Sequence, residues 1–302
     1  MRVLVNQSPN ILSMNCRIRI ALYALIWIIP SFLSGQVAYS LFNQKGKEVT
    51  SEKMLKEIDK ADVIIFGELH NNPICHWMEL EILKSLSREG KSCVMGMEMF
   101  ERDQQPILNE LMNGVFPLKR FEQYTRTWPN YDTDYKPLLK LALERQVRII
   151  ATNIPRQYAS FVFKNGIDSL SKLEIAPHLV PDLDFSVDTT LSSYAEVLEM
   201  GKNMPGHGSE DFLYAQAIKD VSMAESLLKE KKDGVQLYHI NGAFHSKNME
   251  GICHYLIKND PDLKIMTIQS REVDNPSVFQ QQNNESASFY LQINTLMTKS
   301  YE

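Results

Sequence analysis

Short apolar runs alternate along the chain with segments whose apolar residues recur at helical spacing. Helical spacing is clearest at residues 73–86, where Asn72 and Pro73 supply the start signals of a helix. Buried strands are predicted at residues 63–66, 92–100, 147–155, 235–244 and 263–269. Further helices are expected at residues 51–59, 104–112, 135–145 and 247–258. This alternation predicts an α/β fold with a mainly parallel sheet flanked by helices.

The segment between the third and fourth predicted strands has a different pattern. Residues 157–231 contain no good strand, and we expect them to form a small all-helical insertion or lid. Its helical pieces are expected at residues 158–164, 191–200 and 211–231. Residues 276–302 include the polar sequence FQQQNNESAS and are expected to be a flexible polar tail. The α/β domain would then extend from residue 36 to residue 275.

Residues 1–35 have the order of a secretory signal peptide. Arg17 and Arg19 precede the apolar run IALYALIWIIPSFLSG, which ends in small residues. The run is shorter than the ~20 residues of a membrane-spanning helix, and Pro30 interrupts it. We expect an exported protein, periplasmic or associated with the outer membrane, with a retained membrane anchor as the alternative. Gln36 stands where a lipoprotein would carry its lipid-bearing cysteine, so a lipid anchor is not expected.

The composition is that of an ordinary globular protein. The 302 residues carry a net charge of −5, with 44% hydrophobic and 23% charged residues, which argues against disorder. Mild acidity without a basic stripe argues against nucleic-acid binding. Cys75, Cys93 and Cys253 follow the expected signal peptide and have no metal-finger spacing. We expect these three cysteines to be buried as small apolar residues.

Polar side chains follow the predicted strands at the points where the strands end. The first strand ends in GELH, which supplies Glu68 and His70 after Gly67, and the fourth ends in NGAFH, which supplies His245 after Gly242. The second and third strands add Glu98, Asn153 and Arg156. Ligand sites in open parallel sheets form outside the carboxyl ends of the strands. We therefore expect these side chains to form one site, with the glycines allowing sharp turns.

Each of these residues also has a purely structural interpretation. Glu68 can cap the following helix, His70 and His245 can be ordinary loop histidines, and Arg156 can neutralise Glu98 inside its apolar surroundings. As a set, two carboxylates and two imidazoles admit two chemistries. They can bind a divalent metal that leaves a position open for water. Alternatively, a glutamate can act as a general base that a histidine orients, without metal.

The paired sequences GELH and GAFH, with an acidic second strand, resemble the superfamily of Tiki, TraB and erythromycin-esterase-like proteins. Within it, the chain is similar to the ChaN branch, haem-binding proteins linked to iron uptake. The resemblance extends from about residue 62 to residue 269 and includes VMGMEMFERDQQ, ATNIPR and YAQAIKDVSMA. It also includes a stretch with Trp128, Tyr135, Leu138 and Leu139.

The resemblance implies haem as cofactor, held at the helical lid and between two subunits of a homodimer. It also implies a membrane haem-uptake machinery as partner and tyrosine as the iron ligand. Tyr194 and Tyr214 in the insertion are the candidates, with His207 nearby, because tyrosinate and imidazole both suit ferric haem. Structurally, Tyr214 can instead be a core aromatic residue of its helix, and Tyr194 can simply be exposed.

Two functions therefore stay open. The first, which we favour, is an exported haem-binding protein in iron acquisition. The second is a hydrolase of the wider superfamily, dependent on a metal or on a glutamate base. In that case Glu68, His70, Glu98 and His245 would be its catalytic or metal-binding residues. Whether the protein is an enzyme is left open by its sequence.

Overall fold

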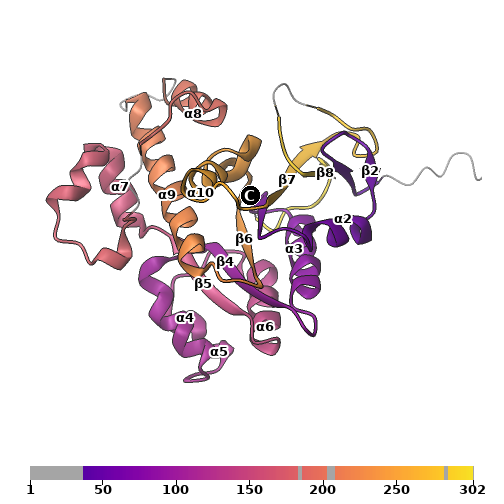
Figure 1. Ribbon diagram of the computed structural model, residues 1–302, viewed down its shortest axis with the longest axis horizontal. Coiled ribbons are helices and arrows are strands. Elements are labelled where there is room, and N and C mark those ends of the chain that lie inside the picture. The colour runs from indigo at the N-terminus through magenta and orange to yellow at the C-terminus, as the bar shows by residue number, and fades with distance from the viewer. Residues whose placement is uncertain (1–36, 183–185, 203–207, 282–284, 302) are drawn as a thin grey trace, which may run out of the picture. The chain divides into compact units, whose positions relative to one another are not determined.

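A single mixed sheet runs through the protein, whose computed structural model describes residues 37–182, 186–202, 208–281 and 285–301. The eight strands follow the order β2-β1-β8-β7-β3-β6-β4-β5 (Figure 1). Their bounds are β1 (Tyr39–Asn43), β2 (Glu48–Val49), β3 (Val63–Glu68), β4 (Ser92–Glu101), β5 (Arg148–Asn153), β6 (Val235–Gly242), β7 (Ile265–Val273) and β8 (Phe289–Asn294). Strands β3 to β8 pair in parallel, whereas β1 is antiparallel to β2 and β8. The prediction of a mainly parallel α/β sheet is confirmed.

Helices cover both faces of this sheet. One face packs against α2 (Ser51–Ile58), α3 (Pro73–Leu86), α4 (Gln105–Met112), α5 (Leu118–Tyr124) and α6 (Lys136–Glu144). The other packs against α7 (Arg156–Asn165), α8 (Ser192–Lys202), α9 (Ser209–Glu230) and α10 (Ile252–Asn259). In β3, Ile64 and Phe66 enter the first core while Val63 and Ile65 enter the second, as the two-residue period of a strand requires. A strand buried on both sides explains the continuous apolar run in the sequence.

Helix α3 begins as its sequence predicts. The side-chain oxygen of Asn72 accepts a hydrogen bond from the backbone N–H of Ile74 at 3.1 Å, and Pro73 occupies the first turn. Trp77, at the edge of the apolar stripe, is 42% exposed and packs its ring 5.6 Å from that of Tyr39. The cap fixes where α3 starts and thereby the short loop that carries His70.

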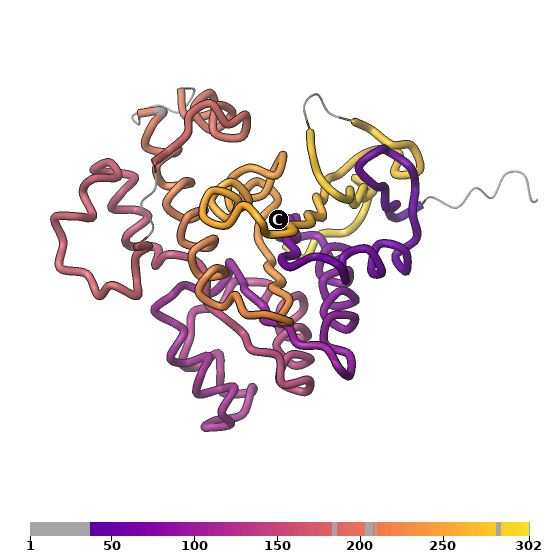
Figure 2. Tube along the Cα trace, viewed as in Figure 1, coloured from indigo at the N-terminus to yellow at the C-terminus, as the bar shows by residue number. Residues whose placement is uncertain are grey.

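The described residues between β5 and β6 form helices and turns without a strand. Figure 2 shows α7 and the following short turns as an excursion to one side, from which α9 returns along the sheet to β6. His207 and the expected signal peptide, residues 1–35, lie outside the described residues. Among the described residues, no helix is both long and apolar enough to cross a bilayer.

The C-terminal segment differs from the expected polar tail. Residues Phe289–Asn294 form β8, which is buried along its length and pairs with both β1 and β7. The strand sequence FYLQIN is short and follows a long polar stretch, so its pattern of apolar residues gives only a weak indication of a strand. Beyond β8, the backbone of Tyr301 accepts a hydrogen bond from the side chain of Asn71 at 3.1 Å. The end of the chain thus contacts the loop after β3.

Strand order brings the predicted site residues to one edge of the sheet. Strand β6 follows the helical insertion in the chain, yet it lies between β3 and β4. The carboxyl ends of these three strands are therefore adjacent, which is the usual place for a site in an open α/β sheet.

Candidate functional site

The two Gly-x-x-His sequences at the ends of β3 and β6 pack against each other. Glu68 lies opposite Gly242 in the parallel register. A Cβ atom on Gly242 would lie 2.7 Å from Cε1 and Nε2 of His70, so glycine leaves the room that this imidazole needs. A Cβ atom on Gly67 would lie 3.0 Å from the backbone of Ala243. Because it has no side chain, each glycine therefore leaves space for residues of the other Gly-x-x-His sequence.

Glu68 is buried at the base of this arrangement. Its Oε1 accepts a hydrogen bond from the hydroxyl of Tyr135 and lies 2.7 Å from Nδ1 of His70. The ring of His70 packs edge-on against Trp128, with centroids 4.8 Å apart. Burial, and then the charge of Glu79, raise the pKa of Glu68 to about 8. This carboxyl therefore holds its proton near neutral pH more readily than an ordinary glutamate.

Glu98, near the end of β4, contacts the second histidine. Its Oε2 accepts a hydrogen bond from the backbone N–H of Gly242 at 2.6 Å, and its Oε1 lies 3.3 Å from Nε2 of His245. Burial raises the pKa of Glu98, but the charges of His245 and His70, together with the hydrogen bonds from His245 and Gly242, outweigh burial and hold that pKa well below its usual range. The observed partner of Glu98 is thus His245. Arg156, the alternative considered from the sequence, is exposed at the start of α7.

His245 connects this edge of the sheet to the helical insertion. Its Nδ1 lies 2.5 Å from Oδ1 of Asp220 and 2.8 Å from the side-chain amide of Gln216, both on α9. The other carboxylate oxygen of Asp220 accepts a hydrogen bond from Tyr194 on α8 at 2.8 Å. Burial lowers the pKa of His245, but the charges of Glu98 and Asp220 more than offset this and raise it to about 10. The imidazolium is held between two buried carboxylates.

A third cluster lies on the α3 side of Glu68. Nδ1 of His76 is 3.1 Å from Oε2 of Glu79 and 3.6 Å from Oε2 of Glu68, while its Nε2 is 3.0 Å from the carbonyl oxygen of His70. Burial raises the pKa of Glu79 to about 8. Among the described residues, Glu68, His76 and Glu79 offer ligand atoms that all lie within 4.8 Å of one another. Of the residues proposed from the sequence as metal ligands, Glu68 belongs to this group.

Two cavities lie near the contact of His70 with Trp128. One, of about 500 Å³, is lined by Glu68, His70, His245 and, from the C-terminal segment, Tyr301. The other, of about 510 Å³, is lined by Trp128 and by exposed arginines, Arg126 and Arg156. Glu68, His70 and His245, which were predicted as site residues, thus share the first cavity. Glu98 contacts one of them, His245, through its carboxylate.

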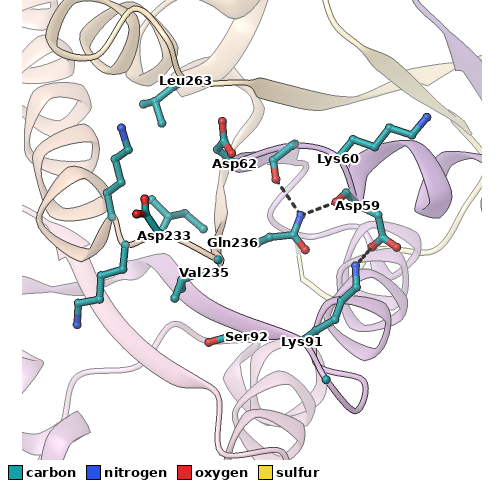
Figure 3. Close-up of a pocket in the computed structure, with 15 residues that line it drawn as sticks. Asp59, Lys60, Asp62, Lys91, Ser92, Asp233, Val235, Gln236 and Leu263 are labelled. Carbon is teal, nitrogen blue, oxygen red and sulfur yellow. Dashed lines mark hydrogen bonds and ion pairs between the residues drawn. The ribbon is translucent and has the colours of Figure 1, made fainter.

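A polar cavity of about 450 Å³ lies at the opposite edge of the sheet, beside the amino ends of β3, β4 and β6 (Figure 3). There Nζ of Lys91 lies 2.6 Å from Oδ1 of Asp59, and the side-chain amide of Gln236 donates to backbone carbonyls of the loop after α2. These groups satisfy one another at the edge where open α/β sheets do not usually bind ligands. We therefore place the functional site at the carboxyl edge.

The two candidate tyrosines have different surroundings. Tyr194 is fully buried, and its hydroxyl donates a hydrogen bond to Asp220. The alternative that Tyr194 is simply exposed is therefore wrong. Tyr214 is half-buried on α9, with its hydroxyl 3.3 Å from Oε2 of Glu210. Asn153 is buried at the end of β5.

The residues not foreseen from the sequence come from helices. Gln216 and Asp220 lie one turn apart on α9, and His76 and Glu79 lie one turn apart on α3. Their signal in the sequence is a pair of polar residues on the apolar face of a helix.

A family model described as haem-binding uptake, Tiki superfamily, ChaN matches residues 54–256. The curated protein RETICULATA-RELATED 5, chloroplastic, of Arabidopsis thaliana is 26% identical over 216 residues, a match that covers 67% of this chain and 29% of that protein. The chain thus spans less than a third of the length of this curated relative.

A solved structure described as "Cofacial heme binding to ChaN of Campylobacter jejuni" shows the same fold, with a TM-score of 0.65 at 17% identity, covering 84% of this chain and 96% of that one. A mutant of the erythromycin esterase EreC in its open conformation has a TM-score of 0.45 at 13% identity, covering 78% and 77% of the two chains.

Proposed function

We propose, from the premise that this chain belongs to the ChaN family of haem-binding uptake proteins in the Tiki superfamily, that it binds haem on its helical insertion during iron acquisition. The observation that carries the proposal is the family match over residues 54–256, which includes the insertion from α7 to α9. The shared fold with a ChaN described as binding haem cofacially supports it.

Tyr214 is the residue that we propose as iron ligand. Tyr194 would have to leave a buried hydrogen bond and expose the carboxylate of Asp220 to reach a ligand at the surface. The hydroxyl of Tyr214 donates a hydrogen bond to the exposed Glu210, so a small movement of the Glu210 side chain frees this hydroxyl. Haem, when bound, supplies a ferric iron that a phenolate oxygen can ligate.

Apolar side chains around the insertion fit a flat macrocycle. The half-buried rings of Phe163 on α7 and Phe212 on α9 pack edge-on with centroids 4.8 Å apart, and Met200 on α8 is 51% exposed. Partly exposed apolar side chains of this kind can contact a flat apolar ligand. We therefore include in the proposal a homodimer in which two copies enclose the haem groups.

The same proposal covers location and partners. Export to the periplasm or the outer membrane without a lipid anchor would place the protein where haem is acquired, and a membrane haem-uptake machinery would receive or deliver the haem. The signal-like order of residues 1–35 supports this part of the proposal.

Titration of haem-free protein with hemin tests the proposal. We expect a saturable new Soret absorption, and an increase in particle mass by light scattering when haem is present. Absorption that rises linearly with hemin, as for hemin alone in buffer, would reject haem binding.

A second function, hydrolysis, is favoured by the convergence of Glu68, His70 and His245 on one cavity. A glutamic acid with a pKa near neutrality is suited to general acid–base catalysis, and Glu98 with Asp220 holds His245 in a fixed orientation and charge state. Hydrolysis of chromogenic esters by wild type and by Glu98→Gln tests this function. Equal rates in both proteins would contradict it.

A further inference from the structure

Three buried carboxylates surround His76 on helix α3. Glu68, Glu79 and Asp134 all have oxygen atoms within 3.1 to 3.6 Å of its imidazole nitrogens. Among the described residues, none of these carboxylates forms an ion pair with a lysine or an arginine. Within the described part of the chain, the ion-pair partners of these carboxylates are histidines. Such a concentration of buried negative charge is costly unless a cation or protons neutralise it.

Two carboxylate oxygens of this cluster accept no hydrogen bond from another kind of side chain or from the backbone, and the Glu68 and Glu79 carboxyl groups interact with each other. The two atoms are Oε2 of Glu68 and Oε1 of Glu79, and both are buried from solvent. Both residues are almost completely buried, at 2% and 0% exposure. They contribute, with Nδ1 or Nε2 of His76, to a group of ligand atoms within 4.8 Å of one another. Buried carboxylate oxygens without such donors point to a ligand or ion at that place.

The hydrogen bonding of His76 indicates which of its two ring nitrogens carries a hydrogen and which can act as an acceptor or a ligand. Its Nε2 lies 3.0 Å from the carbonyl oxygen of His70, which can only accept, so Nε2 carries a hydrogen and donates. Nδ1 then faces Oε2 of Glu79 and Oε2 of Glu68. A proton on Nδ1 would bond to Oε2 of Glu79 but would leave Oε1 of Glu79 and Oε2 of Glu68 without a bond from the imidazole. Histidines that ligate metals typically donate their other N–H to a carbonyl or a carboxylate, as His76 does here.

We propose that Glu68, His76 and Glu79 bind a divalent transition-metal cation. One imidazole nitrogen and carboxylate oxygens suit Zn²⁺, Mn²⁺ or Fe²⁺, whereas Ca²⁺ and Mg²⁺ prefer oxygen ligands alone. Glu68 also lines the 500 Å³ cavity, so one of the three ligand residues borders that cavity. This site is independent of haem binding. It shares Glu68 with the residues proposed from the sequence, but it excludes His70, Glu98 and His245.

Metal binding by haem-free, full-length protein tests the site. Wild type, Glu79→Gln and the matched control Glu81→Gln, on the same helix but paired with Lys84 outside the cluster, are stripped with chelator and titrated separately with Zn²⁺ and with Mn²⁺ in competition with a chromophoric chelator. We expect wild type and Glu81→Gln to bind one equivalent with the same affinity. Changes outside the ligand shell already weaken metal binding by about 10–100-fold, so Glu79→Gln is expected to lose more than about 100-fold.

Wild type alone provides a second test in case Glu79→Gln does not fold. Zn²⁺ or Mn²⁺ in excess should raise its Tm relative to chelated protein, because the ion binds the folded state. Co²⁺ should give weak d–d absorption without a strong thiolate band, since Cys75 is not among the ligands. The proposal is overturned if wild type binds neither ion, if Tm is the same with and without metal, or if Co²⁺ gives a thiolate band. It is equally overturned if Glu81→Gln loses as much affinity as Glu79→Gln.

Discussion

The imidazole Nε2 of His245 lies 3.3 Å from the carboxylate Oε1 of Glu98, and both side chains are buried. The two residues come from strands β6 and β4, which are far apart in the chain but adjacent in the sheet. Asp220 contacts the opposite nitrogen of the same ring. The strand ends and the helical insertion are therefore joined through one charged histidine.

Replacement of His245 by glutamine should destabilise the protein in a pH-dependent way. The pKa of His245 is raised from 6.5 to about 10 on folding, so its contribution is complete below pH 6.5 and is lost as the pH rises toward about 10. The pKa of Glu98 is lowered, so its contribution is lost as the pH falls below 4.5. Unfolding in urea at several pH values measures the difference in free energy between wild type and variant.

The loss expected at pH 6 is roughly 3–5 kcal/mol, because removal of one partner leaves a buried charge uncompensated. It should shrink steadily between pH 7 and pH 10. A loss that is constant over this range would show that His245 is not charged in the folded protein.

Tyr194 and Tyr214 should respond differently to substitution by phenylalanine. Tyr194→Phe leaves Oδ2 of the buried Asp220 without its hydrogen-bond donor and is expected to cost about 1–3 kcal/mol of unfolding free energy. Tyr214→Phe removes a hydrogen bond at the surface and should change stability by less than about 0.5 kcal/mol. Denaturant unfolding of both variants without haem checks the contrast. Equal effects would refute the structural role of Tyr194.

The two motif glycines should tolerate alanine to different degrees. At Gly242 the added Cβ meets the end of a side chain, the ring of His70, which can rotate away. At Gly67 it meets the backbone of Ala243, which cannot. We expect Gly67→Ala to lower Tm and Gly242→Ala to leave Tm nearly unchanged while displacing His70. The histidine resonances in an NMR spectrum report that displacement, and a larger Tm loss for Gly242→Ala would contradict this interpretation.

Strand β8 should be indispensable for folding. A protein that ends at residue 275 lacks the strand between β1 and β7, so both lose hydrogen-bond partners and apolar neighbours. We expect this truncated protein to be recovered as aggregate. A control that ends at residue 297 keeps β8 and should be soluble with a cooperative thermal transition. Soluble, cooperatively folding protein from the shorter chain would show that β8 is dispensable.

The core of the fold could be predicted because its local signals agree with its tertiary environment. Strand β3 reads as a continuous apolar run since it is buried on both faces, and α3 has its cap at Asn72. Strand β8 lacked such a signal, because its burial depends on pairing with β1, which is more than two hundred residues away in the chain.

The candidate site could be predicted in part for the same reason. Glu68, His70, Glu98 and His245 are recognisable as polar residues at the ends of apolar strands. Asp220 and His76 lie inside helices, and their roles arise only where those helices approach the strand ends. Whether the buried tyrosine is Tyr194 or Tyr214 likewise depends on the packing of α8 against α9, which periodicity does not specify.

The absorption spectrum of hemin bound to wild type, Tyr194→Phe and Tyr214→Phe tests the central claim most directly. We predict that wild type and Tyr194→Phe share a tyrosinate-type spectrum and that Tyr214→Phe loses it. Tyr214→Phe should also show weaker hemin binding, while its Tm without hemin stays that of wild type. An unchanged spectrum in Tyr214→Phe, or loss of the spectrum in Tyr194→Phe alone, would contradict the assignment of Tyr214 as the haem ligand.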